Sequence, residues 1–75
     1  MHKEMFGNTV YRLRKRKKLS RRELGKLLGV NEKTVNKWEA HKECPSVNLL
    51  PLLVELLNDT EGDLFLYYYD FLEVA

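Results

Sequence analysis

The chain has 75 residues, of which 44% are hydrophobic and one is a cysteine. This length allows a single domain, residues 1–75, and excludes a division into two cores. The lone Cys44 excludes an internal disulfide. Because no apolar run is long enough for a signal peptide or a membrane span, we expect a cytoplasmic protein.

The charges divide along the chain. All 13 Lys and Arg lie in residues 1–44 beside five acidic residues, whereas residues 45–75 carry six acidic residues and no Lys or Arg. A merely solvated surface mixes the two signs. We therefore expect a basic pole and an acidic pole, and a polyanion such as nucleic acid would approach the basic one.

The first predicted helix spans about residues 5–17, where Phe6, Val10 and Leu13 recur at helical spacing. The second follows a capping box, Ser-Arg-Arg-Glu at residues 20–23. It should end at about Leu28, because the glycine that follows suits a left-handed C-terminal residue.

The third predicted helix spans residue 32 to about residue 40, after Asn31 as its N-cap. Val35 and Trp38 fall on its inner face, and we expect Trp38 to be a core anchor toward the next helix. The opposite face is entirely polar. The turn before this helix is so short that the second and third helices cannot lie side by side.

A fourth, leucine-rich helix should begin near Leu50, because Pro51 is tolerated only in a first turn. Residues 60–63, Thr-Glu-Gly-Asp, resemble a second capping box and predict a fifth helix from Glu61 to about Tyr69. An extended C-terminal tail over residues 66–74 is the alternative. The expected fold is thus an all-α, five-helix bundle.

Several segments together match a known pattern. The chain resembles the phage-repressor and Cro-like helix-turn-helix family over roughly residues 6–66, with the helix-turn-helix at about residues 19–40. The residues that carry the resemblance are Leu13-Arg14, Leu19-Ser20, Glu23-Leu24-Gly25, Leu28-Gly29-Val30, Thr34-Val35, Trp38-Glu39 and Pro45.

The sequence departs from the family's pattern in three places. Gly25 stands where alanine is usual, Lys18 where glycine or asparagine often ends the first helix, and Ala40-His41 where a pair such as Asn-Gly ends the third. None of these positions belongs to the polar face of the third helix.

The resemblance implies that the third helix enters the major groove of DNA and that the second lies across the phosphate backbone. The exposed polar residues of the third helix suit this role, since lysine donates to guanine, threonine contacts a thymine methyl or a phosphate, and asparagine pairs with adenine. Glu32 either accepts from cytosine or simply favours the helix N-terminus. The candidate base contacts are Glu32, Lys33, Thr34, Asn36 and Lys37.

Phosphate contacts are expected at the start of the second helix and in the loop before Pro45, from Ser20, Arg21, Arg22 and Lys42. The basic run at residues 14–18 turns around its helix, so only part of it can face DNA. The family's pattern implies that Arg14 pairs with Glu39 in a structural role.

The sequence gives little indication of metal binding or catalysis. His41 and Cys44 stand three apart, but with only His2 to add they fall short of a structural zinc site, so no metal and no cofactor are expected. No hydroxyl or thiol nucleophile is placed near a histidine, and we expect no enzymatic activity.

Residues 60–75 are rich in aromatic side chains. One face of a short helix cannot bury all of them. We expect some of them to meet another chain, most simply a second copy. The candidate interface residues are Phe65, Tyr67, Tyr68, Tyr69 and Phe71.

The sequence therefore predicts a sequence-specific, double-stranded DNA-binding regulator of repressor or Cro type from a phage or mobile element, acting as a homodimer on a pseudo-palindromic operator. The alternatives are a modulator or antirepressor that binds a repressor, and the antitoxin of a toxin–antitoxin pair. Both of these would act mainly through a partner protein bound by the aromatic segment.

Overall fold

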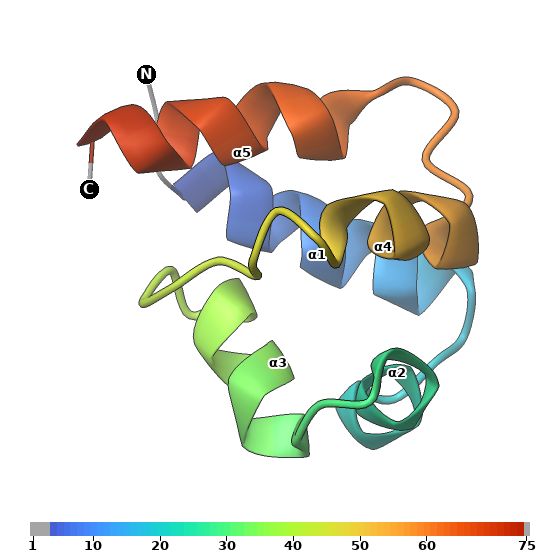
Figure 1. Cartoon of the computed structure of the whole chain (residues 1–75). Helices are drawn as coiled ribbons and strands as arrows, with labels where there is room; N and C mark the ends of the chain where they lie inside the picture. Colours follow the sequence, from blue (N-terminus) through green and yellow to red (C-terminus); the bar gives the residue numbers. More distant parts are fainter. Residues whose placement is uncertain (1–3, 75) are drawn as a thin grey trace.

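Five helices make up the computed structural model, which describes residues 4–74 (Figure 1). They are α1 (Glu4–Arg16), α2 (Arg21–Leu28), α3 (Glu32–Glu39), α4 (Leu50–Leu57) and α5 (Asp63–Val74). Over this part of the chain there is no strand. The predicted all-α fold with five helices is confirmed, and the extended-tail alternative is wrong, because α5 continues to Val74.

Helix α1 is the centre of the arrangement. It lies between α5 on one side and the α2–α3 pair on the other, with α4 leaning against α1 and α5 (Figure 1). Helices α2 and α3 contact each other closely and cross rather than run parallel. The outer face of the α2–α3 pair is therefore open to a large partner on the side away from α5.

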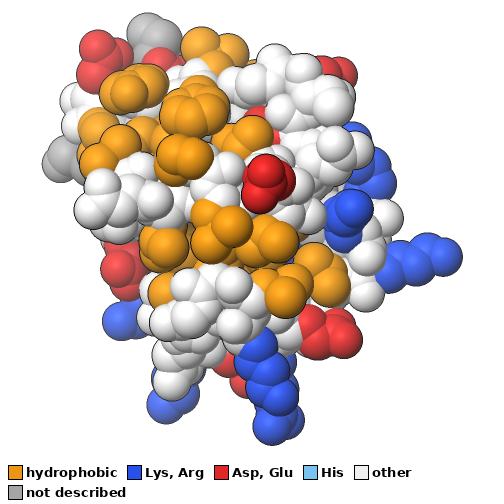
Figure 2. Space-filling model, turned by 45° about the vertical axis from the view of Figure 1, so that its right-hand side comes forward, with side chains coloured by type: hydrophobic (Ala, Val, Ile, Leu, Met, Phe, Trp, Pro, Cys, Tyr) orange, Lys and Arg blue, Asp and Glu red, His pale blue; other side chains and the backbone are white. Residues whose placement is uncertain are grey.

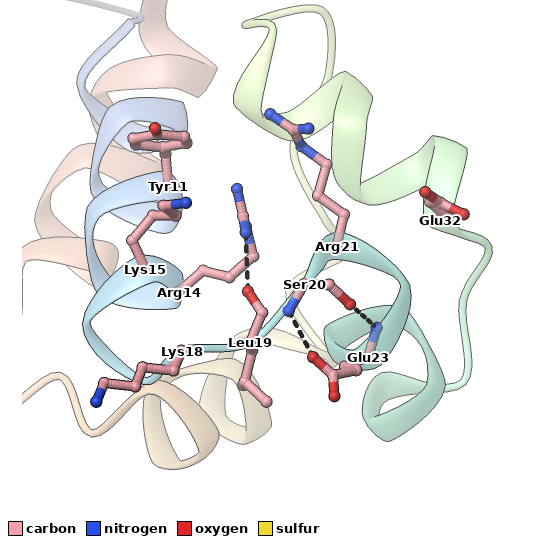
Figure 3. Close-up of a pocket in the computed structure, with 9 residues that line it drawn as sticks. All are labelled: Tyr11, Arg14, Lys15, Lys18, Leu19, Ser20, Arg21, Glu23 and Glu32. Carbon is pink, nitrogen blue, oxygen red and sulfur yellow. Dashed lines mark hydrogen bonds between the residues drawn. The ribbon is translucent and has the colours of Figure 1, made fainter.

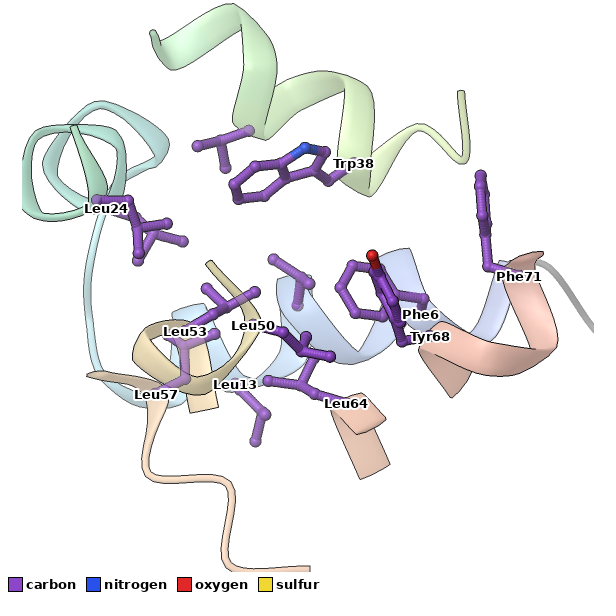
Figure 4. Packing of buried hydrophobic residues seen from close by; sticks show 13 residues of the cluster. Phe6, Leu13, Leu24, Trp38, Leu50, Leu53, Leu57, Leu64, Tyr68 and Phe71 are labelled. Atoms are coloured by element: carbon purple, nitrogen blue, oxygen red, sulfur yellow. The ribbon is translucent and has the colours of Figure 1, made fainter. Parts of the chain in front are cut away.

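One apolar core joins all five helices (Figure 4). Trp38 of α3 is 1% exposed and belongs to the same cluster as the buried leucines of α4, so the expectation of a core tryptophan is confirmed. The fully buried side chains are Trp38, Phe6, Leu13, Leu24, Leu50, Leu53, Leu57, Leu64, Val10 and Val35.

Local signals set both ends of α2 and the starts of α3 and α4 where the sequence predicted them. The capping box is complete, since the Ser20 side chain accepts from the Glu23 backbone N–H and the Glu23 side chain accepts from the Ser20 backbone N–H. Gly29 ends α2 in the left-handed region at φ 76°. Asn31 caps α3 through its side chain, and α4 begins at Leu50 with proline in its first turn.

The predicted start and end of the fifth helix are wrong. It begins at Asp63 rather than Glu61, because the chain turns through Gly62 at φ 77° and the Asp59 carboxylate accepts the Leu64 backbone N–H at 2.8 Å. Asp59 therefore does the capping that the sequence pattern assigned to the threonine at residue 60. The helix extends past Tyr69 to Val74.

Two of the predicted interface residues lie in the core. Tyr68 and Phe71 are 4% and 6% exposed, and with Leu64 they form the face of α5 that packs on α1. Tyr68 meets the ring of Phe6 edge to face at a centroid distance of 5.8 Å. These residues are thus buried within the chain itself and are not free to meet another one.

The departures from the family's pattern coincide with special backbone geometry. Lys18 and His41, which follow α1 and α3, both adopt left-handed conformations, at φ 59° and 66°. Glycine or asparagine adopts this region with less strain than lysine or histidine. At Gly25 a Cβ atom would lie 2.8 Å from the Val30 carbonyl oxygen, so the α2–α3 turn is too close for the usual alanine unless the backbone shifts.

Candidate nucleic-acid interface

Helix α3 presents a polar, solvent-exposed face. Val35 and Trp38 are buried, which turns the other side of the helix outward. The candidate base contacts Glu32, Lys33, Asn36 and Lys37 are exposed, and Thr34 is partly buried. The structure thus brings the five predicted base-contact residues together on one short helix.

A buried carboxylate fixes α3 against α1 and α2. The Glu39 side chain, 4% exposed, accepts from Arg14 Nε at 2.6 Å and from Arg14 Nη2 at 3.1 Å. Its Oε1 also accepts from Arg21 Nε at 2.9 Å. Arg14 donates further to the Leu19 carbonyl oxygen at 2.8 Å. One carboxylate thus ties three helices together and sets how α3 projects.

The second arginine of this cluster was missed by sequence analysis. The resemblance pointed to the Arg14–Glu39 pair, whereas the bond between Arg21 and Glu39 depends on the crossing of α2 and α3. The Arg21 side chain is 40% exposed. The guanidinium therefore contacts Glu39 through Nε while its outer edge faces solvent.

The remaining candidate phosphate contacts, Ser20, Arg22 and Lys42, are exposed. Ser20 lies at the start of α2, where its hydroxyl oxygen accepts from the Glu23 N–H at 3.0 Å. The Ser20 backbone N–H donates to the Glu23 carboxylate at 2.8 Å and, with its side chain and the charge of Lys26, lowers the Glu23 pKa. The hydroxyl proton of Ser20 remains available to a phosphate oxygen.

A basic groove of about 690 Å³ opens between the end of α1 and the start of α2 (Figure 3). Its walls come from both helices and from the first residue of α3. The lining residues are Tyr11, Arg14, Lys15, Lys18, Leu19, Ser20, Arg21, Glu23 and Glu32.

Hydrophobic side chains also gather on one face of the molecule (Figure 2), and exposed ones occur on both α4 and α5. Of the predicted interface residues, Phe65 and Tyr69 are 39% and 56% exposed, and Tyr67 is partly buried. Leu66 and Leu72, which are 58% and 51% exposed, lie beside them but were not among the predicted interface residues, which were all aromatic. We call Phe65, Leu66, Tyr69 and Leu72 the apolar face of α5.

Residues 4–74 contain neither a cluster of metal-ligating side chains nor a membrane-spanning helix. Within them, no three His, Cys, Asp or Glu side chains gather where they could hold a metal ion. His41 and Cys44 are both partly buried, burial raises the pKa of the Cys44 thiol, and His2 lies outside the described residues. None of the helices in this range is long and apolar enough to cross a membrane.

Two short helices that cross at a tight turn, with an exposed polar face on the second, define a helix-turn-helix DNA-binding domain. A family model described as Helix-turn-helix matches residues 10–65. The chain belongs to this family, the XRE-type, Cro/C1-like helix-turn-helix proteins, which are DNA-binding transcriptional regulators. Comparison with curated proteins and with solved structures gave no match.

Proposed function

We propose that this chain is a repressor-type, Cro-like regulator of a phage or mobile element, which acts in the cytoplasm as a homodimer on a pseudo-palindromic operator. The observation that carries the proposal is that α3 is fixed to the core on one side and exposes a polar face on the other. Its inner face is anchored by Trp38 and Glu39, and its outer face presents polar side chains without apolar interruption.

Base reading falls to the outer face of α3. Lys33 and Lys37 donate to guanine edges, Asn36 pairs with adenine, and Thr34 contacts a thymine methyl. Glu32 accepts from the cytosine amino group. Lys37 has an exposed partner in Glu43 at 3.7 Å, and DNA can displace so weak a pair at little cost.

Phosphate binding falls to Ser20, Arg21 and Arg22 on one side and to Lys42 on the other. These residues fix the register of the protein on the duplex rather than its sequence preference. The bond from Arg21 to Glu39 supports this role, because it holds the guanidinium at the surface in one orientation.

The apolar face of α5 supplies the dimer contact. Its four side chains would be covered by a second copy, and helix-turn-helix dimers place their recognition helices about 34–36 Å apart. Leu66→Gln/Tyr69→Gln should shift the chain toward monomer in sedimentation velocity. Asn48→Gln, at another exposed position, is the control, and an unchanged dimer in the double variant would remove α5 from the interface.

A second candidate function rests on the same face. Acidic residues, among them Asp70 and Glu73, border it on α5, and such a rim suits a partner protein with a basic rim. In that case the chain is a modulator, antirepressor or antitoxin. Copurification of a stoichiometric repressor or toxin from the native host would favour this function over the first.

The decisive experiment is selection of bound sequences from randomised duplex DNA, followed by titration at several salt concentrations. Wild type should enrich a two-fold-related site with affinity that falls steeply as salt rises. Lys33→Ala/Lys37→Ala should lose the enrichment, whereas Lys17→Ala, a control with an exposed lysine outside α3, should keep it. Weak, unselective binding that the double variant retains would reject operator reading.

A further inference from the structure

Basic residues of α1 and of the turn that follows it divide among three environments. Arg12 and Arg16 face the α4–α5 side, where Arg12 pairs with Asp63 at 3.3 Å and Arg16 Nη2 donates to the Asn58 carbonyl oxygen at 2.9 Å. Arg14 is buried on Glu39. The charges of these three arginines are therefore engaged within the fold.

The third environment is the basic groove, which Lys15 and Lys18 line. With Tyr11 they follow one another at positions i, i+4 and i+7 and line the basic groove beside α2 (Figure 3). Both lysines and the tyrosine are exposed, and the Lys15 Nζ lies 6.0 Å from the centre of the Tyr11 ring. Neither lysine forms an ion pair within residues 4–74.

The opposite wall of the groove contains Ser20 and Arg21, both of which are candidate phosphate contacts. Two acidic residues, Glu23 and Glu32, also line the groove, and they lower its positive potential only in part. Glu23 is bound to the Ser20 N–H, and Glu32 belongs to the face of α3. The groove thus combines flexible ammonium donors, a phenol and a hydroxyl, a set that suits the oxygens of a phosphate.

We propose that this groove binds a phosphate of the DNA backbone next to the one contacted by Ser20, with Lys15 and Lys18 as direct contacts and Tyr11 as a hydroxyl donor. The inference rests on the proposed function and extends it, because it adds α1 to the DNA-binding surface. It also divides roles among the basic residues of this region, since Lys15 and Lys18 bind DNA while Arg12, Arg14 and Arg16 hold the fold.

The test compares Lys15→Ala/Lys18→Asn with Lys17→Ala on the selected operator. Asparagine is chosen at residue 18 because it tolerates the left-handed backbone there. Each lost phosphate contact should lower the slope of log affinity against log salt by about 0.9, so the double variant should lose about 1 to 2 in slope and bind more weakly. Its sequence preference should not change, and Lys17→Ala should match wild type.

The outcomes separate the two proposals. Selective wild-type binding with an unchanged slope in Lys15→Ala/Lys18→Asn would overturn the groove and leave the regulator intact. Failure of wild type to select any site would overturn both. An NMR titration with inorganic phosphate is the third arm, and lysine shifts at low phosphate concentration without a change in the DNA slope would overturn DNA in favour of a free phosphate ligand.

Discussion

The α1–α3 part of the molecule, residues 4–39, joins its helices partly through charge, whereas the α4–α5 part, residues 50–74, relies on apolar side chains. In the first part a buried carboxylate receives two arginines from different helices. In the second, leucines and aromatic residues pack against α1. The polar contacts of this part with α1, from Arg12 to Asp63 and from Arg16 to the Asn58 carbonyl oxygen, are exposed rather than buried. Orientation is therefore fixed most strictly around α3, the proposed DNA-reading helix, because a directional ion pair fixes an angle that leucines leave adjustable.

Removal of the buried carboxylate should destabilise the fold more than any other substitution considered below. Glu39→Ala leaves Arg14 buried without its carboxylate and should lower the free energy of unfolding by about 3–5 kcal/mol in urea denaturation. Asp63→Ala removes the partly buried partner of the exposed Arg12 and should cost at most about 1 kcal/mol. Equal effects of the two variants would show that the buried cluster is not special.

A neighbouring pair of tyrosines tests the apolar part in the same way. Tyr68→Ala empties the space against Phe6 and should cost about 3 kcal/mol or more in thermal or urea unfolding. Tyr69→Ala, at a position 56% exposed, should change stability by no more than about 0.5 kcal/mol in dilute solution. If Tyr69→Ala proved the more damaging, the assignment of the inner face of α5 would be wrong.

A smaller loss is expected where α1 approaches the end of α3. A Cβ atom on Gly7 would lie 2.4 Å from the Trp38 carbonyl oxygen, so Gly7→Ala should destabilise the fold by about 1–3 kcal/mol despite the better helix propensity of alanine. Asn8→Ala, at the exposed position next to it, is the control and should be neutral or slightly stabilising. A stabilised Gly7→Ala would mean that the two helices separate easily.

One substitution should separate stability from function. Lys18→Gly relieves a left-handed lysine and should raise the unfolding free energy by up to about 1 kcal/mol. The same change removes a proposed phosphate contact and should weaken DNA binding. Denaturation and a salt-dependent titration of the same sample check both effects, and a Lys18→Gly variant that binds DNA more tightly would contradict the role of the groove.

The smallest effect concerns the capping box. The Ser20 N–H lowers the pKa of Glu23, so the ionised carboxylate stabilises α2 above the ordinary glutamate pKa, and this contribution is lost as pH falls through the lowered one. An NMR titration should find Glu23 more acidic than an ordinary glutamate. Ser20→Pro, which removes the N–H, should return the Glu23 pKa toward its ordinary value, and Ser20→Ala should do so less.

The sequence predicted what nearby residues decide. Both ends of α2 and the start of α3 follow from Ser20, Gly29 and Asn31, each of which acts on its own backbone or within three residues. The start of α5 was missed because Asp59 reaches five residues ahead, after a turn that the spacing of a capping box does not describe.

The candidate site was predicted unevenly for a similar reason. The polar face of α3 is visible in helical periodicity alone. By contrast, the bond from Arg21 to Glu39 and the division between Tyr68 and Tyr69 depend on how helices cross and on which side of α5 meets α1. Periodicity within one helix cannot supply either, because both are properties of a pair of helices.

The separation of charge along the chain has a consequence for how the protein finds DNA. The basic half contains the proposed recognition surface, and residues 45–75 carry only acidic charges, so the molecule should have an electric dipole as well as a net charge. In the field of a duplex such a dipole would turn α3 toward the phosphates and α5 away from them before contact. Collisions that begin in the wrong orientation would thereby be corrected during approach, and the surface left exposed on the DNA-bound protein would be the acidic one.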